Sequence, residues 1–435
     1  MKPFLSKFRV YLLVVLLGCV FLFESCHDQC EDRYTYSYYE PVYTPLSVIR
    51  SSIAVDEPRQ ITGVGKIYFK DGYLFVNEPG EGIHVIDNHD PANPLRKHFI
   101  TIPGNYDMAI RNNILYADSY IDLVGLDISN PDQVVEVSRL ENIFSQYNSM
   151  GFYVDAQRGL VTEWAEKKNV EIEESPCDAD MQPWGGYYYR GGIVMWAEGD
   201  MSTFKGATLS NNSTGVGGSM AKFTISDDHL YMLDSWMLHA ADISNPAEVI
   251  KKSTTQISWD IETIFPLEDK LFIGSQSGMH IFSLADPANP KKVSTYEHVR
   301  SCDPVVVEGE TAYVTLRSGT QCQGFTNQLE VIDVSNWENP ALMKVYPMHN
   351  PHGLGIDESL LFVCDGDAGL KIYDATDKYN IDQHLIKHYD NIHAFDVIPF
   401  NNVLMLIGED GIYQYDYSDP TKIKLLSKLS IKSAQ

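Results

Sequence analysis

Five acidic or histidine side chains carry the clearest chemical potential in this sequence. Each lies just before the first β-strand expected in a repeating unit. They are Asp107, Asp260, Asp303, His352 and His393. If these strands surround a common axis, Asp and His at their starts can hold a metal ion or act as acid and base.

The positions of these residues are not in strict register along the repeat. Counted back from the second strand of each unit, Asp107 stands eight residues before Leu115 and His352 nine before Leu361. A metal or catalytic ring built by repetition needs equivalent positions. The spacing therefore favours turn caps and polar channel lining, and we predict ligand-binding candidates at a channel mouth with no metal and no cofactor.

A second candidate surface is an aromatic segment within residues 176–192. It combines four glycines with four aromatic side chains, Trp184, Tyr187, Tyr188 and Tyr189. Exposed rings beside flexible glycines suit stacking on a sugar or contact with a protein. The alternative is that these rings cover the core of the insertion itself.

No motif in the sequence supplies a nucleophile with its base. G-x-S-x-G, H-E-x-x-H and P-loop patterns are all absent, so no catalytic residue is predicted. The run Asp365–Gly369 resembles the start of a calcium loop but lacks its later acidic ligands. It is predicted to be a hairpin turn.

The elements that must position these side chains are set by a repeat. Seven short apolar runs each end at one position, here called the marker residue. The markers are Asp87, Asp127, Asp242, Ser283, Asp333, Asp374 and Asp416. They lie 40 to 50 residues apart, except for 115 residues between Asp127 and Asp242. Each unit reads as strand, tight turn, strand, apolar run and Asn/Asp-Pro corner, followed by a fourth strand.

The 115-residue interval between Asp127 and Asp242 contains one degenerate unit, whose remnant is residues 152–164, and an insertion at about 165–217. A period near 40 filled with short strands is typical of a radially repeated fold. The prediction is an all-β propeller with four-stranded antiparallel blades. The count is eight blades, or seven if the remnant is only an addition.

Two further structural expectations follow from the repeat. The marker residues should cap the corners through side-chain to backbone hydrogen bonds, because repetition in nearly every unit indicates scaffold. Residues 45–53 resemble the fourth strand of a unit, so one end of the chain should complete a blade begun by the other.

The N-terminus has the features of an export signal. Basic residues precede an apolar run from Val10 to Phe23, which is short for a transmembrane helix. The arrangement resembles a bacterial lipoprotein leader with Cys26 as the lipidated residue. Cys19 is the alternative site, and a secretory leader without lipid is another. The predicted organisation is a signal peptide (1–25), a tether (26–44) and a propeller (45–435).

Other features bound the compartment and the partners. Export permits disulfides, and Cys302 with Cys322 could pin the long loop of one unit. The formal charge of −26, from 59 acidic and 33 basic residues, argues against nucleic acid and anionic lipid surfaces as partners.

The repeat resembles the LVIVD-repeat family, best in residues 329–335 and 369–374. That family comprises predicted β-propellers of bacteria and archaea that are frequently exported, and it implies no shared reaction. The resemblance covers residues 60–425 apart from the insertion. The leader and the acidic tether resemble those of Bacteroidetes lipoproteins, which implies a lipid anchor in the outer membrane of a Gram-negative cell, facing outward.

These observations together predict a cell-surface lipoprotein that acts as a non-enzymatic binding or scaffolding module. Its expected partner is a glycan or an envelope protein. The alternative is a polysaccharide-acting enzyme, a lyase or hydrolase, that uses Asp and His at the channel mouth.

Overall fold

The computed structural model describes residues 35–144, 153–171, 216–234, 236–258, 261–298, 304–318 and 326–432. The chain forms two compact units. The smaller comprises residues 1–42 and 163–194, and the larger comprises residues 43–162 and 195–435. Apart from short helical segments, the regular secondary structure of the described residues consists of β-strands.

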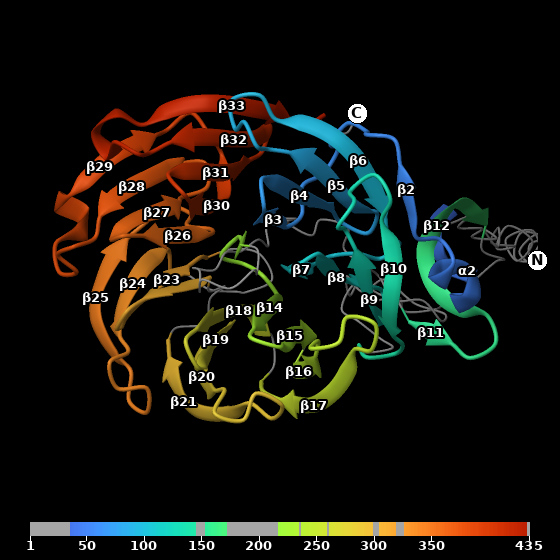
Figure 1. Cartoon of the computed structure of the whole chain (residues 1–435). Helices are drawn as coiled ribbons and strands as arrows, with labels where there is room; N and C mark the ends of the chain where they lie inside the picture. The colour runs from blue at the N-terminus through green and yellow to red at the C-terminus, as the bar shows by residue number, and fades with distance from the viewer. Residues whose placement is uncertain are drawn as a thin grey trace, which may run out of the picture. The chain divides into compact units, whose positions relative to one another are not determined.

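Seven sheets of the larger unit repeat one four-stranded antiparallel pattern, with strands in sequence order from the centre outward (Figure 1). The innermost strands are β3 (Ile67–Lys70), β7 (Met108–Arg111), β14 (Phe223–Ser226), β18 (Ile261–Leu267), β22 (Val305–Glu308), β26 (Leu354–Asp357) and β30 (Ala394–Phe400). The second strands are β4 (Tyr73–Glu78), β8 (Ile114–Ser119), β15 (His229–Asp234), β19 (Lys270–Ser275), β23 (Thr311–Leu316), β27 (Leu360–Cys364) and β31 (Val403–Gly408).

The apolar runs of the repeat form the third strands. They are β5 (Gly82–Asp87), β9 (Asp122–Asp127), β16 (Met237–Asp242), β20 (Gly278–Ser283), β24 (Gln328–Asp333), β28 (Leu370–Asp374) and β32 (Gly411–Asp416). The outer strands are β6 (Leu95–Thr101), β10 (Val135–Leu140), β17 (Ile250–Gln256), β21 (Lys291–Glu297), β25 (Ala341–Pro347), β29 (Leu385–Tyr389) and β33 (Lys424–Ser430).

Contacts between innermost strands join these seven sheets into a ring. The neighbouring pairs are β3–β7, β7–β14, β14–β18, β18–β22, β22–β26 and β26–β30, and β30 contacts β13 (Val216–Gly217), which pairs with β3. Because each blade is covered by a blade on both sides, most second and third strands are buried on both faces. They therefore read as continuous apolar runs rather than as alternating ones.

The described part of the chain contains eight antiparallel sheets, as many as the repeat units predicted. The eighth sheet has three strands, in the order β1 (Thr35–Thr44), β12 (Gly159–Glu171) and β11 (Val154–Asp155). It contains the degenerate remnant, which forms β11 and the start of β12 as a hairpin. The all-β propeller with four-stranded antiparallel blades is confirmed. The ring of contacting inner strands corresponds to the alternative in which the remnant is an addition.

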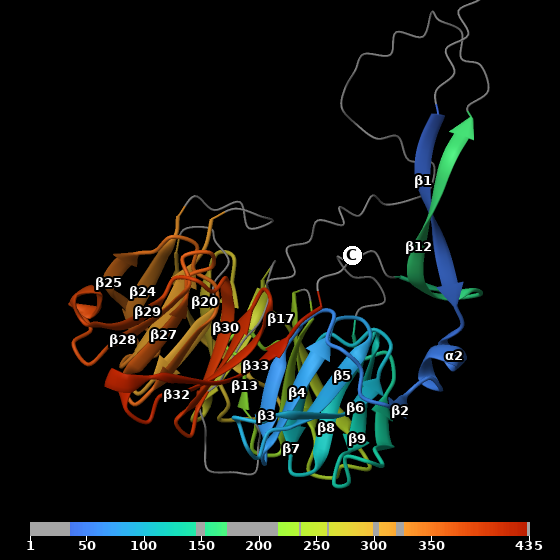
Figure 2. The same cartoon turned by 90° about the horizontal axis from the view of Figure 1, so that it is seen from above.

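The expected exchange of a strand between the chain ends is wrong. Residues 46–50 form a short helix, α2, and the strand that follows, β2 (Ala54–Asp56), pairs with β6 at the edge of the first blade. The last blade is built entirely from β30–β33. Figures 1 and 2 show the first and last blades side by side, and the Lys432 amide donates to the Ile61 carbonyl at 2.9 Å. Closure thus depends on contacts between complete blades.

The marker residues cap the corners, as predicted. Each accepts a hydrogen bond from the backbone N–H two residues ahead, at 2.8 to 3.3 Å in all seven corners. The hydrogen bonds with Ser129 lower the pKa of Asp127, and those with Ser418 lower that of Asp416. These carboxylates are engaged in hydrogen bonds at the corners, so their role is structural.

Glycine stands at or directly before the start of several third strands, because the outer strand passes close to it. Gly82 has φ +146° and Gly369 has φ +89°. A Cβ at either position would collide with a backbone carbonyl, that of Ile100 or Tyr389. The repeat also contains a feature that the sequence pattern does not reveal. All seven blades have a β-bulge between the third and outer strands, which twists the outer edge.

Candidate functional site

We call the loops that lead into the innermost strands the channel mouth, because the Asp and His candidates predicted from the sequence belong to these loops. Asp107 directly precedes β7, His352 lies two residues before β26, and His393 directly precedes β30. The other predicted site residues lie outside the described residues. They are Asp260, Asp303, Trp184, Tyr187, Tyr188 and Tyr189, together with Cys26, Cys302 and Cys322.

The structure brings His352 and His393 together around Phe395. The ring centroids of the two histidines are 6.3 Å apart, and those of His393 and Phe395 are 4.6 Å apart. The His352 ring lies 5.3 Å from Phe395 in an edge-to-face arrangement. We call His352, His393, Phe395 and the adjacent Arg317 the ring cluster.

His352 is held firmly by its backbone. Its N–H donates to the Cys364 carbonyl at 2.6 Å, and its carbonyl accepts from the Thr315 hydroxyl at 2.6 Å. The side chain is buried with 3% exposure. Burial, together with the nearby Arg317 and His393, lowers the pKa of His352 to about 2. His352 is therefore a neutral imidazole at physiological pH, which does not suit a general acid or base there.

The contact with Arg317 defines which nitrogen of His352 carries the proton. Arg317 Nη1 lies 3.4 Å from His352 Nε2. A guanidinium can only donate, so Nε2 accepts and Nδ1 carries the N–H. Within the described part of the chain, this buried Nδ1 has no hydrogen-bond partner. His393 is more open, with its side chain 34% exposed and Nδ1 3.6 Å from the Glu409 carboxylate.

Asp107 belongs to a second group of polar side chains, centred on Lys66. The Asp107 carboxylate accepts from the backbone amides of Lys222 at 2.5 Å and Met108 at 2.7 Å. Burial raises its pKa, and the charge of Lys66 opposes that rise. Burial lowers the pKa of Lys66 to about 8, although Asp107 and other carboxylates oppose the shift. Asp107 thus holds the start of β7 to the distant segment at Lys222, so its carboxylate does more than cap a local turn.

Four residues of this region were missed by the sequence argument: Arg317, Phe395, Asp118 and Asp365. Asp118 lies near the end of β8, and its Oδ1 accepts from the amides of Tyr106 at 2.8 Å and Asp107 at 2.9 Å. Asp365 follows β27 and accepts likewise from the amide of Asn350 at 2.8 Å. The sequence signal that could have identified Asp118 and Asp365 is their shared position, at or directly after the end of the second strand of a blade.

Asp118 should make stability depend on pH. Burial raises its pKa from 3.8 to about 7. The folded state therefore keeps a proton that the unfolded chain has released. The resulting stabilisation is full below about pH 4 and is lost as the pH rises through 7. In Asp118→Asn, the amide oxygen can still accept from the same backbone amides.

We therefore expect the stability of Asp118→Asn relative to the parent to increase by about 1–2 kcal/mol between pH 5 and pH 8. Urea unfolding at the two pH values measures this difference. Asp132→Asn is the control, because that carboxylate is 65% exposed. An equal difference between variant and parent at both pH values would exclude the proposed titration.

The segment Asp365–Gly369 is the hairpin turn predicted. The Asp365 amide donates to the Gly369 carbonyl at 2.7 Å, between β27 and β28.

Among the described residues, no group of three or more His, Cys, Asp or Glu is placed to hold a metal ion. Cys364 is a buried free thiol whose pKa is raised by burial. Within the same residues, no helix is long and apolar enough to cross a membrane.

Comparison with known proteins agrees with the class that this fold defines, a β-propeller. The crystal structure of a protein from Lactobacillus plantarum covers 85% of this chain and 97% of its own, with a TM-score of 0.51 and 10% identity. The computationally designed Ika8 protein covers 87% and 91%, with a TM-score of 0.50 and 10% identity. Identities this low establish the fold alone.

At the level of sequence, the LVIVD repeat matches residues 300–347. No curated protein matches the chain. The protein is thus a β-propeller that carries an LVIVD repeat, and this repeat fold is suited to a binding or scaffolding module.

Proposed function

We propose that this protein is a lipid-anchored, cell-surface binding module of a Gram-negative bacterium of Bacteroidetes type, and that it recognises a glycan or an envelope protein without catalysis. The observation that carries the proposal is the ring cluster at the channel mouth. It combines the ring of Phe395 with the partly exposed imidazole of His393, whose Nδ1 lies 3.6 Å from the Glu409 carboxylate. Ring faces beside a fixed polar group suit a sugar, which has an apolar face and hydroxyl acceptors.

Binding should depend on the more accessible members of the cluster. His393→Ala is expected to weaken glycan binding by about two- to twelvefold, because one stacking ring is worth about 0.5–1.5 kcal/mol. A glycan array of the mature chain identifies the ligand, and calorimetry then compares the variants. His384→Ala is the matched control, because His384 is an exposed histidine beside the outer strand β29. Equal affinity in His393→Ala would exclude the ring cluster.

The aromatic insertion is the other proposed contact. Trp184→Ala or Tyr187→Ala should weaken the same binding if the insertion contributes to it. If these variants fail to bind while His393→Ala binds normally, recognition belongs to the insertion. If the array and envelope extracts yield no ligand, the binding proposal fails.

Among the described residues, the alternative enzyme is favoured by the His393–Glu409 pair, in which a carboxylate lies 3.6 Å from a partly exposed imidazole. Release of reducing sugar or of unsaturated product from a bound polysaccharide would establish it. Its loss in both His393→Ala and Glu409→Gln would assign the two side chains as acid and base. Binding without release leaves the recognition module as the function.

The anchor has its own test. Cys26→Ala should abolish incorporation of labelled fatty acid, because the thiol of the first mature residue carries the lipid. Cys19→Ala is the control and should retain labelling. Proteolysis of intact cells should remove the protein if it faces outward. Labelling that persists in Cys26→Ala and disappears in Cys19→Ala would move the anchor to the alternative cysteine.

A further inference from the structure

The junction between the first and last blades contains a buried pair of side-chain amides. Asn88 Nδ2 donates to Gln414 Oε1 at 2.8 Å, and Gln414 Nε2 donates back to Asn88 Oδ1 at 2.7 Å. Gln414 Nε2 also lies 3.3 Å from the Ser427 hydroxyl, and that hydroxyl donates to the Pro91 carbonyl at 2.6 Å. Asn88 is 2% exposed and Gln414 is fully buried.

This amide pair departs from the repeat at both of its positions. Asn88 directly follows a marker residue; the corresponding residues in the other six blades are Ile128, Ile243, Leu284, Val334, Ala375 and Tyr417. Gln414 lies two residues before a marker; the corresponding residues are Val85, Gly125, Ala240, Ile281, Val331 and Ile372. Only the closing junction therefore has an amide at both positions. A buried amide pair gives no clear gain over apolar packing, and such departures from a local pattern are expected at functional or strained sites.

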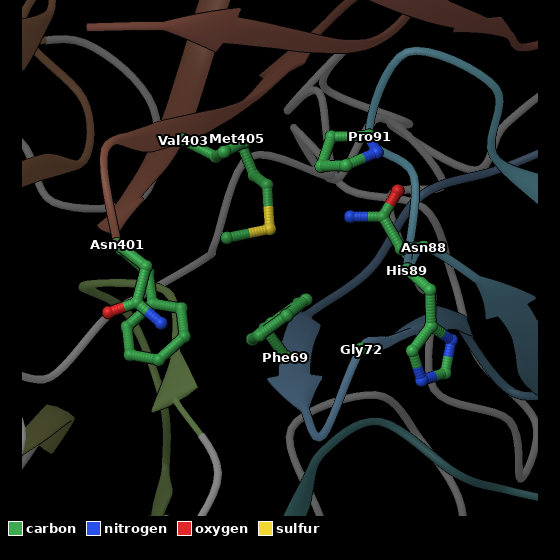
Figure 3. Close-up of a pocket in the computed structure, with 9 residues that line it drawn as sticks. Phe69, Gly72, Asn88, His89, Pro91, Asn401, Val403 and Met405 are labelled. Atoms are coloured by element: carbon green, nitrogen blue, oxygen red, sulfur yellow. The ribbon is translucent and has the colours of Figure 1, made fainter. Parts of the chain in front are cut away.

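A cavity of about 210 Å³ opens beside the amide pair (Figure 3). It lies at the ends of the innermost strands, opposite to the loops of the channel mouth. Its walls include Phe69 from the first blade and Phe400 from the last, with ring centroids 5.1 Å apart and planes tilted by 47°. Met405, Val403 and Pro91 add further apolar surface.

Asn88 supplies a polar anchor inside this apolar cavity. Figure 3 shows its amide nitrogen directed toward Met405 across the cavity. An amide nitrogen has two N–H groups, and the bond to Gln414 uses one of them. The second N–H is placed to donate to an acceptor on a bound molecule.

The volume restricts what can enter. A dry cavity of about 150 Å³ holds benzene, whereas pockets for larger ligands begin at about 300 Å³. We propose that the closing junction is a second binding site, distinct from the channel mouth, for one aromatic ring that carries a hydrogen-bond acceptor. The ring packs against Phe69, Phe400 and Met405, and its acceptor bonds to Asn88. A free phenol and the side chain of a partner's tyrosine share this chemistry.

Titration of the full chain with p-cresol and toluene, followed by NMR, tests the proposal. We expect p-cresol to bind with a Kd of the order of 1 mM and toluene to bind at least about fivefold more weakly. N-acetyltyrosine amide separates the sources. If it binds as well as p-cresol, the site accepts a tyrosine side chain. If only p-cresol binds, the site takes a free phenol.

Two variants replace residues of the closing junction with the kinds of residue found at the corresponding positions of other blades. Phe400→Ser introduces the residue that ends β14 at the corresponding position, and it should weaken p-cresol binding at least about fivefold. The pair Asn88→Ile with Gln414→Val restores the apolar pattern of the other junctions and should abolish the preference for p-cresol over toluene. If neither ring binds, or if the preference survives in the double variant, the proposal is overturned. The amide pair would then serve only to match the first blade to the last.

Discussion

Asp122→Ala is expected to lower the free energy of unfolding by about 1–3 kcal/mol, because it removes the buried acceptor that Arg50 and Arg139 share, although Arg50 keeps Glu141 and Arg139 keeps Glu136. Asp122 is 2% exposed at the start of β9. It accepts from Arg50 Nε at 2.7 Å, from Arg50 Nη2 at 3.0 Å and from Arg139 Nη1 at 3.1 Å. It also accepts from the Asn142 amide at 2.9 Å. Urea unfolding followed by circular dichroism measures the loss.

The matched control for Asp122 is Asp132→Ala. Asp132 also contacts a basic side chain, His98, at 2.7 Å, but it is 65% exposed. We expect this change to stay within about 0.5 kcal/mol of the parent. If Asp122→Ala costs no more than the control, the buried network contributes little, and α2 is held at Arg50 by other contacts.

Phe272→Ala is expected to destabilise the protein by about 3–5 kcal/mol, because it leaves a cavity between two blades. Phe272 is fully buried on β19. Its ring meets that of Trp337 edge-to-face at 5.7 Å, and Trp337 lies in the corner between β24 and β25 of the next blade. The loss should appear both as a lower melting temperature and as a lower urea midpoint.

Phe272→Leu separates lost volume from lost ring geometry. A leucine fills most of the space, so we expect a cost below about 1.5 kcal/mol. Trp337→Ala should cost less than Phe272→Ala, because Trp337 is only partly buried, and the double variant should cost less than the sum of the two. Additive losses would indicate that the two rings do not stabilise one another.

Much of the architecture depends on residues that are close together in the sequence, and it could therefore be predicted from the sequence. The turn at Asp71–Gly72 and the Pro-containing corners require particular backbone geometries, so they mark where strands end. The marker residues act within two residues of their own position, and for that reason their role as corner caps could be predicted. The loop Asp365–Gly369 was predicted correctly for the same reason.

Features that depend on packing between distant segments were predicted wrongly or were not predicted. Residues 45–53 have a strand-like composition, yet Leu46–Arg50 is a helix, and Arg50 at its end pairs with Asp122, which is 72 residues away. The bulges in the outer strands also left no sequence signal. The composition of a segment indicates which secondary structure it prefers. A contact with a distant residue can override that preference, and such contacts are seen only in the tertiary structure.

The sequence by itself determined the repeated strands, the corners and the propeller class, because these depend on residues close together in the chain. Only the tertiary structure decided which side chains share a site. It placed His352 and His393 around Phe395, assigned Asp107 to the Lys66 group, and joined Asn88 to Gln414 across 326 residues. Closing a ring brings its two ends together, and no periodic pattern specifies how the first blade differs from the others at that junction.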